Sequence, residues 1–425
     1  MLLKMRQIFL SAALLLTAQG VLAQATPAQL AANPELTAGI YHSYEYTPTD
    51  RTPAPKGFTP FYISHYGRHG SRWYTSASPY EKTRELLRKA AQANALTPKG
   101  IDLLARVEVL ADDALDRYGD LSPRGVQEHR GIAERMYTAY PEVFSTKGGR
   151  ICRIESRSTL VPRCILSMAA FNERLKEFDP SIVATRESSE RYVRYLSHTP
   201  GHSHQRDQGC YGVADSLLRA RVKPARLLSS LFSDEEFVRR EVKDSVGVMK
   251  HLYDLCSISQ DADHLGIRIY DAFTPEELFT LWECANVSNY LSYGPSARFG
   301  DTIVLDARPL LTNIVTTAQQ VIDGDSDLSA SLRFGHDTNI IPLLALLGIE
   351  GASDRVADLD SVRMVWNNFR VTCMGTNLQL IFYRNKAGEV LVKLLHNERE
   401  ARIPLPGGPY YRWEEFRKYC EAKCR

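Results

Sequence analysis

Phe61-Tyr62-Ile63-Ser64-His65-Tyr66-Gly67-Arg68-His69-Gly70-Ser71-Arg72 is the most informative stretch of this chain, because an apolar run leads directly into a group of arginine and histidine side chains. Its apolar start predicts a buried strand over Phe61–Tyr66 that opens into a loop. In that loop His69 lies between two arginines, and the flanking glycines let a ligand approach the backbone closely. Paired guanidinium N–H groups hold a phosphate or carboxylate well, and an imidazole between them can attack or transfer a proton. The alternative, a surface loop that happens to be basic, is disfavoured by the rest of the chain.

Two further stretches repeat the order of strand, loop and helix. The sequence predicts strands over Arg150–Glu155 and Ser331–Phe334, followed by helices over Thr159–Lys176 and Ile340–Leu347. This repetition predicts an α/β fold in which helices sandwich a mainly parallel sheet.

Capping and turn residues mark further element boundaries. Ser122-Pro123 predicts a helix start, and Thr274-Pro275-Glu276-Glu277 has the character of a capping box. Near the C-terminus, Asn385-Lys386-Ala387-Gly388 separates apolar runs at Leu378–Arg384 and Val390–Leu395, which predicts a β-hairpin.

The length of 425 residues favours two domains, or one domain with a large insertion. We expect an irregular N-terminal arm over residues 24–56 and an α/β catalytic core over 57–180 and 301–425. The mostly helical stretch 181–300 interrupts the core and is expected to form an inserted cap domain.

The residues from Met1 to Ala23 resemble a secretory signal peptide. Lys4 and Arg6 precede a short apolar stretch, and Val21-Leu22-Ala23 offers small or short residues at the cleavage position. The apolar stretch is short for an uncleaved anchor, and no later stretch is long and apolar enough to span a membrane. We therefore expect an exported protein, periplasmic or secreted, that is cleaved near Ala23.

The cysteines all follow this segment. An even number in an exported chain favours disulfide bonds, with buried thiols as the alternative. The eight are Cys152, Cys164, Cys210, Cys256, Cys284, Cys373, Cys420 and Cys424.

The ends of the three predicted strands carry functional groups of one kind. Parallel sheets bind ligands at the carboxyl ends of their strands, so these groups are expected to converge. The first strand delivers Arg68, His69 and Arg72, the second leads to Arg163, and the third ends at His336 and Asp337.

Phosphoryl transfer through a histidine is the chemistry that suits this set. An imidazole nitrogen attacks phosphorus while fixed cations stabilise the equatorial oxygens. A carboxylic acid protonates the departing alkoxide and then activates water, which favours activity at acidic pH. Arginines supply the positive charge, so no metal and no other cofactor is expected.

The composition disfavours other partners. The net charge of +2 is too small to suggest nucleic-acid binding by bulk electrostatics. His198, His202 and His204 lie close together, but no acidic partner at helical spacing accompanies them, so a solvated or cap-lining loop is favoured over a metal site.

The sequence resembles the histidine acid phosphatases, the branch of the histidine phosphatase superfamily that contains phytases and multiple inositol polyphosphate phosphatases. Arg68-His69-Gly70-Ser71-Arg72 matches the family's Arg-His-Gly-x-Arg motif, and His336-Asp337 matches its His-Asp motif. Leu121-Ser122-Pro123-Arg124-Gly125 resembles the family's Leu-Thr-x-x-Gly helix start, and Arg163 matches its third arginine. The resemblance spans residues 58–405.

The resemblance implies a phosphoglycerate-mutase-like sandwich with a helical cap. It also implies that His69 becomes phosphorylated, that Asp337 is the proton donor, and that Arg68, Arg72, Arg163 and His336 hold the phosphate. The implied partner is a small phosphorylated molecule, with inositol polyphosphate favoured.

Three alternatives remain on the same scaffold. They are a broad-specificity acid phosphatase, a sugar-phosphate phosphatase, and a phosphate-binding protein with a decayed site.

Two departures from the family pattern bear on the pocket. Trp73-Tyr74 stands where the family usually has a proline, and Thr338-Asn339 differs from the usual inositol polyphosphate phosphatase pattern.

Overall fold

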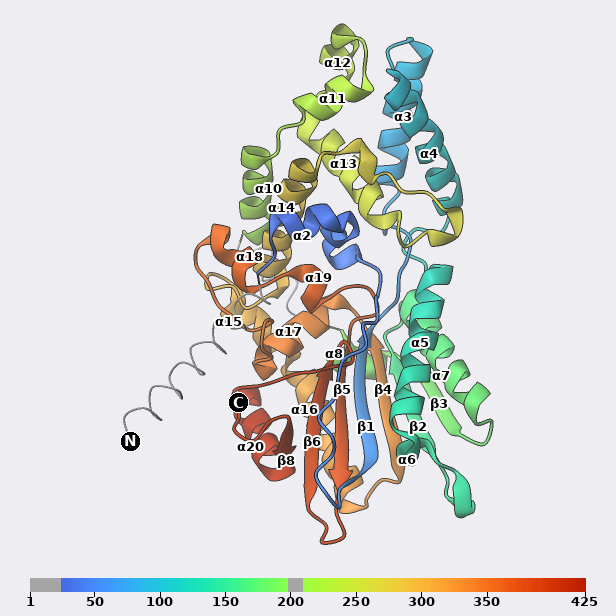
Figure 1. Cartoon of the computed structure of the whole chain (residues 1–425), viewed down its shortest axis with the longest axis vertical. Coiled ribbons are helices and arrows are strands. Elements are labelled where there is room, and N and C mark those ends of the chain that lie inside the picture. Colours follow the sequence, from blue (N-terminus) through green and yellow to red (C-terminus); the bar gives the residue numbers. More distant parts are fainter. Residues whose placement is uncertain (1–23, 198–208) are drawn as a thin grey trace.

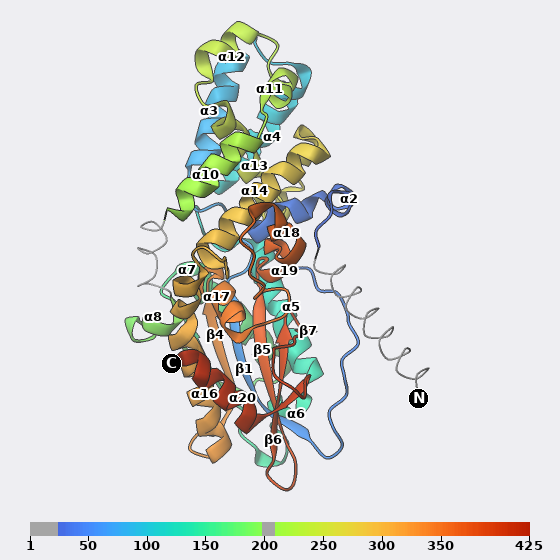
Figure 2. The ribbon, with the colours of Figure 1, turned by 90° about the vertical axis from the view of Figure 1, so that its left-hand side faces the viewer.

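The computed structural model describes residues 24–197 and 209–425. It has a twisted sheet with helices on both faces, and a helical lobe stands over one end of that sheet (Figure 1). The turned view shows the same two parts, with the sheet edge-on between its covering helices (Figure 2). The predicted α/β class is confirmed.

The sheet has eight strands, and its main path runs β3-β2-β4-β1-β5-β6-β7, with β8 paired to β6. Neighbouring strands from β3 to β1 are parallel, whereas β5 runs antiparallel to both β1 and β6. All the longer strands except β5 therefore point the same way, which makes the sheet largely parallel. The strands are β1 (Thr59–Arg68), β2 (Arg153–Ser158), β3 (Val183–Ser188), β4 (Leu328–Gly335), β5 (Asn377–Arg384), β6 (Val390–His396), β7 (Arg399–Glu400) and β8 (Tyr410–Arg412).

Consecutive residues of β1 pack into different cores on the two faces of the sheet, as the pleat requires. Ile63 points to the core shared with Ile132 of α5 and Phe171 of α7. Tyr62 points to the opposite core, which includes Leu311 of α16. Because both faces are covered, the central strands are buried almost throughout, including polar residues such as Ser64, Ser331 and Arg333.

Proline and capping residues start several of the covering helices. Ser122 accepts a hydrogen bond from the Gly125 N–H at 3.3 Å, and Pro123 occupies the first turn, as the sequence predicts. Gly348, with φ of +72°, ends the helix that follows β4. One face carries α5 (Pro123–Ala139), α6 (Pro141–Phe144) and α7 (Pro162–Phe178); the other carries α8 (Glu190–Leu196), α16 (Arg308–Asp323), α17 (Asp337–Leu347) and α20 (Trp413–Cys424).

Other connections are short. The predicted hairpin between β5 and β6 is present, and Asn385 Oδ1 accepts hydrogen bonds from two backbone N–H groups of its turn. The remaining short elements are η2 (Lys147–Gly149), α15 (Gly300–Ile303), η5 (Val304–Ala307), η6 (Leu359–Ser361), α18 (Val362–Val365) and α19 (Asn368–Val371).

The helical lobe is built from two chain segments rather than one insertion. In both views α3 and α4 lie beside α11 and α13 (Figures 1 and 2), and Leu103 shares an apolar core with Leu228 and Leu252. The lobe contains α3 (Ser78–Gln92), α4 (Pro98–Ala114), α10 (Cys210–Arg221), α11 (Ala225–Leu231), α12 (Glu235–Glu241), α13 (Ser245–Ile258), η3 (Asp263–Leu265), η4 (Tyr270–Ala272) and α14 (Pro275–Tyr293). The capping box predicted at Thr274 and Glu277 is present.

Two predicted boundaries therefore differ from the structure. The cap was expected to begin at residue 181, but Val183–Ser188 pairs along its whole length with β2 and belongs to the sheet. Residues 78–114 were expected in the core and instead extend the lobe, because their apolar stripes face α11 and α13.

The arm over residues 24–56 is not wholly irregular. It contains α2 (Pro27–Ala32) and the 3₁₀ segment η1 (Pro34–Tyr41), and Leu30 is buried against Trp282 of α14. Thr26 caps α2 by accepting the Gln29 N–H at 3.2 Å. The expected signal peptide, Met1 to Ala23, lies outside the described residues.

The predicted disulfide bonds are wrong for this structure, because no two of the eight cysteines, all of which lie within the described residues, form a disulfide. Seven are buried and are distributed over separate apolar cores: Cys152 packs with the α5 face, Cys420 with the α16 face and Cys256 within the lobe. They act as small apolar side chains, and burial raises the pKa of Cys373 to about 11.

Over residues 24–197 and 209–425, no helix combines the length and apolarity that a bilayer span requires.

Candidate active site

The carboxyl ends of β1, β2 and β4 meet at the edge of the sheet that faces the helical lobe. Arg68 lies opposite Gly335 in the β1–β4 pair, and Ser158 lies opposite Phe334 in the β2–β4 pair. The loops that leave these strands therefore start side by side. The strand ends, these loops and the helix starts that follow them carry all six residues that the sequence singled out: Arg68, His69, Arg72, Arg163, His336 and Asp337.

His69 lies at the centre of this edge with a defined tautomer. Its Nδ1 lies 2.8 Å from the carbonyl oxygen of Gly70, which only accepts, so Nδ1 carries the proton. The Nε2 lone pair is then free to attack. Burial lowers the pKa of His69 well below its ordinary value, and the charges of Arg68 and Arg163 act in the same direction. The lowered pKa favours the neutral imidazole that a nucleophile requires.

Three guanidinium groups surround His69. Arg68 is fully buried and donates from Nη1 to the carbonyl oxygens of Ile40 and Thr372, at 2.5 and 2.9 Å. Arg72 donates to the Trp73 carbonyl oxygen at 2.9 Å, and Arg163 donates to that of Gly119 at 3.3 Å. Carbonyl oxygens orient these groups without neutralising them.

The clustering of these cations is electrostatically costly without an anion. Burial lowers the pKa of Arg163, and the charge of Arg72 lowers it further. The buried Nε atoms of both arginines have no hydrogen-bond partner within the described part of the chain. Such a group of desolvated, mutually repelling cations is suited to bind a dianion.

His336 and Asp337 begin α17 and complete the group. The ring centroids of His336 and His69 are 5.7 Å apart, and His336 Nε2 lies 3.2 Å from Thr159 Oγ1. Asp337 Oδ2 lies 2.9 Å from Arg68 Nη2. Burial alone would raise the pKa of the Asp337 carboxyl, but the charge of Arg68 holds it below its usual range. Asp337 is thus ionised in this structure.

Sequence reasoning missed the residues that hold the loop after β1. Ser71 donates its backbone N–H and its hydroxyl to the Glu128 carboxylate, both at 2.7 Å, and its Oγ lies 2.9 Å from Asp261. These partners come from α5 and from the residues after α13. Ser71 stands within the first motif, but no sequence signal links it to carboxylates so distant along the chain.

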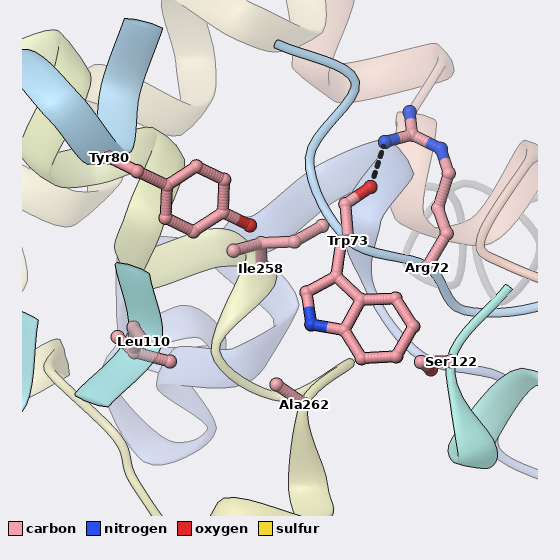
Figure 3. Close-up of a pocket in the computed structure, with 7 residues that line it drawn as sticks. All are labelled: Arg72, Trp73, Tyr80, Leu110, Ser122, Ile258 and Ala262. Carbon is pink, nitrogen blue, oxygen red and sulfur yellow. Dashed lines mark hydrogen bonds between the residues drawn. The ribbon is translucent and has the colours of Figure 1, made fainter. Parts of the chain in front are cut away.

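Trp73, which directly follows Arg72, packs in the apolar core of the lobe and points away from the Arg72 guanidinium. Its indole N–H donates to Asp113 at 2.8 Å. Figure 3 shows its ring beside Ala262 and Ser122, in a tight apolar pocket that Tyr80, Leu110 and Ile258 also line. The side chain anchors the loop to the lobe while Arg72 turns back toward the site.

The basic residues of the cap are mostly engaged with carboxylates. Arg219 contacts Asp215 and Asp244 at 2.9 and 3.0 Å. Arg221 pairs with Glu283 at 2.8 Å, and Arg226 pairs with Glu277. The possibility that they meet distal phosphates of a substrate is therefore not supported by their contacts.

In the described part of the chain, no group of three or more His, Cys, Asp or Glu side chains is arranged to hold a metal ion. His198, His202 and His204 lie outside the described residues.

Comparison with known families links the second half of the chain to one of them. Residues 223–397 match the model of the histidine phosphatase superfamily (branch 2). This stretch contains His336 and Asp337 and most of the lobe. No curated protein sequence matches the chain.

Solved structures share the fold over nearly the whole chain. Multiple inositol polyphosphate phosphatase from Bifidobacterium longum, in complex with inositol hexasulfate, has a TM-score of 0.71 at 19% identity and covers 89% of this chain and 96% of that one. The phytase from D. castellii has a TM-score of 0.66 at 16% identity, with 92% and 85% covered. Hafnia alvei phytase in complex with myo-inositol hexakis sulphate has a TM-score of 0.53 at 13% identity, with 88% and 100% covered. At these identities the likeness concerns the fold.

Proposed function

We propose, since the chain belongs to branch 2 of the histidine phosphatase superfamily, that it is a phosphomonoesterase that forms a phosphohistidine on His69. Proteins of this branch are generally phosphomonoesterases. The observation that carries the proposal is a neutral, buried imidazole with a free Nε2, surrounded by three arginines at one sheet edge.

In the first step the ester phosphate takes the place between Arg68, Arg72 and Arg163. His69 Nε2 forms a bond to phosphorus as the ester P–O bond breaks, and the arginines stabilise the charge on the equatorial oxygens. Asp337 gives its proton to the leaving alkoxide. In the second step Asp337 takes a proton from water, which attacks phosphorus and releases inorganic phosphate and His69.

The first step requires a protonated Asp337, although this carboxyl is ionised against Arg68 in the free site. A bound phosphate supplies negative charge to Arg68 and Arg72, which removes the main cause of the low pKa. Substrate binding and protonation of Asp337 are therefore coupled, and acidic pH favours both.

Inositol polyphosphate is the substrate class we favour, because the similar structures include phytases and an inositol polyphosphate phosphatase. One observation favours a second candidate, a general acid phosphatase or sugar-phosphate phosphatase. Arg219, Arg221 and Arg226 already have carboxylate partners, so they offer little free charge to a polyanion. The signal-like N-terminus leads us to propose that the enzyme acts after export, in the periplasm or outside the cell.

The test is phosphate release from inositol hexakisphosphate and from an aryl phosphate at mildly acidic pH without added metal. Preference for the inositol substrate supports a phytase-type enzyme, whereas release only from the aryl ester leaves the general phosphatase. His69→Ala should abolish turnover and the phosphohistidine trapped by rapid alkaline quench, while its circular dichroism remains that of the wild type. Wild-type turnover in this variant would refute the mechanism, and no release from any ester would leave a phosphate-binding protein.

A further inference from the structure

We propose that Asp261 is a positioning residue whose protonated carboxyl fastens the catalytic loop, through Ser71, to Glu128 and the helical lobe. The proposal rests on the proposed function, because the loop that Ser71 belongs to carries His69 and Arg72. Asp261 itself follows α13 and touches no reacting group in this arrangement.

The contacts form a small buried network at the junction of loop, lobe, arm and α5. Asp261 Oδ1 lies 2.9 Å from Ser71 Oγ and 2.8 Å from Ser43 Oγ. Glu128 receives the Ser71 N–H and the Ser71 hydroxyl, and its Oε1 also accepts the Tyr44 N–H at 2.8 Å. Asp261 and Ser71 are 0% exposed, so water does not complete these contacts.

A count of hydrogens shows where a proton must lie. Ser71 has one hydroxyl hydrogen, yet its Oγ is within hydrogen-bond distance of Glu128, Asp261 and, at 3.2 Å, the Ser43 hydroxyl, whose own hydrogen goes to Asp261. One of the two carboxyls must therefore donate. Glu128 already accepts three donors and lies 3.9 Å from the Arg124 guanidinium, so it is the anion. Asp261 then donates to Ser71, which donates to Glu128.

The electrostatics of the network agree with this assignment. Burial raises the pKa of both carboxyls, to about 8 for Asp261, where the charge of Glu128 contributes to the rise, whereas hydrogen bonds from Ser71 and Tyr44 and the charge of Arg124 lower the pKa of Glu128. Arg72, from the catalytic loop, lowers the pKa of Asp261. Other ionisable groups around the network lie on α5, on the arm and on the segment of Asp261. Arg124 of α5 pairs with Asp263, which follows Asp261 along the chain and also pairs with Arg268. His42 of the arm contacts Gln260 at 3.1 Å, and burial lowers the pKa of His42.

Loss of this proton has a structural consequence for the site. Ser71 would then face two carboxylates with a single hydroxyl hydrogen, so one of its two contacts becomes repulsive. Gly70 and Ser71 pack directly against the backbone of Gly125, so the strain passes to His69 and Arg72 on either side. The lobe and the phosphate site are thereby coupled through one carboxyl group.

The test compares wild type with Asp261→Asn and Asp261→Ala over pH 5 to 9, using kcat and the affinity for inorganic phosphate. Asn can place its amide nitrogen where Asp261 Oδ1 lies, donate a hydrogen to the Oγ atom of Ser71 and another to that of Ser43, and has no titration, so it should match wild-type kcat within about twofold at acidic pH. The ratio of its kcat to that of wild type should rise as pH passes about 8. Ala should lower kcat by about 10- to 100-fold at every pH, as expected for a misplaced catalytic loop.

Infrared spectroscopy gives a readout that does not depend on turnover. The protonated carboxyl band of Asp261, isolated by subtracting the spectrum of Asp261→Asn so that other buried carboxyls such as Asp254 cancel, should be present in wild type at pH 6 and disappear at alkaline pH. If Asp261→Ala fails to fold, Ser71→Ala removes the same contact between Ser71 and Asp261 and should show the same loss of kcat. The matched control is Asp254→Asn. Asp254 lies on α13, is buried, has a raised pKa and pairs with Lys250. The ratio of the kcat of this variant to that of wild type should not change with pH.

Two outcomes would overturn the proposal: a difference spectrum that lacks this carboxyl band at pH 6, or an Asn-to-wild-type kcat ratio that does not change with pH. Should wild type hydrolyse no phosphomonoester, the proposed function fails, and the infrared band together with phosphate affinity still decides the role of Asp261.

Discussion

Gly70 is the position where one methyl group should separate folding from catalysis. A Cβ atom added there would lie 2.5 Å from the Gly125 carbonyl oxygen and 2.6 Å from its Cα. Both atoms belong to the backbone at the start of α5 and cannot rotate away. Since carbon atoms pack at about 3.5 Å or more, the loop must retreat by about 1 Å.

We expect Gly70→Ala to lower the free energy of unfolding by about 1–3 kcal/mol, the usual cost of overpacking a close contact. A retreat of this size beside His69 should lower kcat by about 100-fold, because near-attack geometry is lost. Urea unfolding followed by circular dichroism gives the first quantity, and steady-state phosphatase kinetics give the second.

Gly131→Ala is the matched control on the same helix. The three atoms nearest to its added methyl all belong to the Arg135 guanidinium, with Nη1 at 2.9 Å; this side chain, which pairs with Glu398 through Nε and Nη2, can shift where a backbone atom cannot. Alanine is favoured over glycine inside a helix by about 0.5–1 kcal/mol, so this variant should be at least as stable as wild type and fully active. If Gly70→Ala also keeps wild-type stability and kcat, the close backbone packing described here is not what fixes the loop.

Two further predictions concern proton-linked behaviour. Asp337→Asn should lower kcat by about 10²- to 10⁴-fold on alkyl phosphates and far less on aryl phosphates, whose leaving groups need no proton. Because Arg68 then loses its ion pair with Asp337, inorganic phosphate should inhibit the variant more strongly than wild type. Equal losses of kcat on both esters would contradict the assigned role of Asp337. Burial lowers the pKa of His65 to about 3 and of His129 to about 4, below the ordinary 6.5, so their stabilising contribution is complete above pH 6.5 and is lost as pH falls toward 4. In that interval each of these histidines should lower the free energy of unfolding by about 1.4 kcal/mol for every unit by which pH falls. His65→Phe and His129→Phe should therefore flatten the dependence of the urea midpoint on pH between pH 7 and 5. Unchanged profiles would contradict this role of the two histidines.

Local sequence signals specified most of the α/β core. The apolar runs, the caps at Ser122 and Thr274 and the stop at Gly348 predicted elements that the structure contains, because these signals act within one or two turns of the chain. The site residues were also accessible, since parallel strands present their carboxyl ends at one edge and the motifs follow those strands directly.

Boundaries and packing partners required the tertiary structure. β2 runs over Arg153–Ser158 rather than the expected Arg150–Glu155, because pairing with β4 sets where the strand ends. The even cysteine count favoured disulfides, yet the thiols fill separate cores, and a count carries no information about distance.

The sequence by itself determined which side chains are available for the chemistry: an imidazole between arginines, a His-Asp pair and the strands that carry them. Only the tertiary structure decided how they are held. Ser71 meets Asp261 across 190 residues, and the arginines of the lobe meet carboxylates instead of a ligand. Such contacts depend on which apolar faces pack together, and the free energy of that packing is a property of the whole fold rather than of any local stretch.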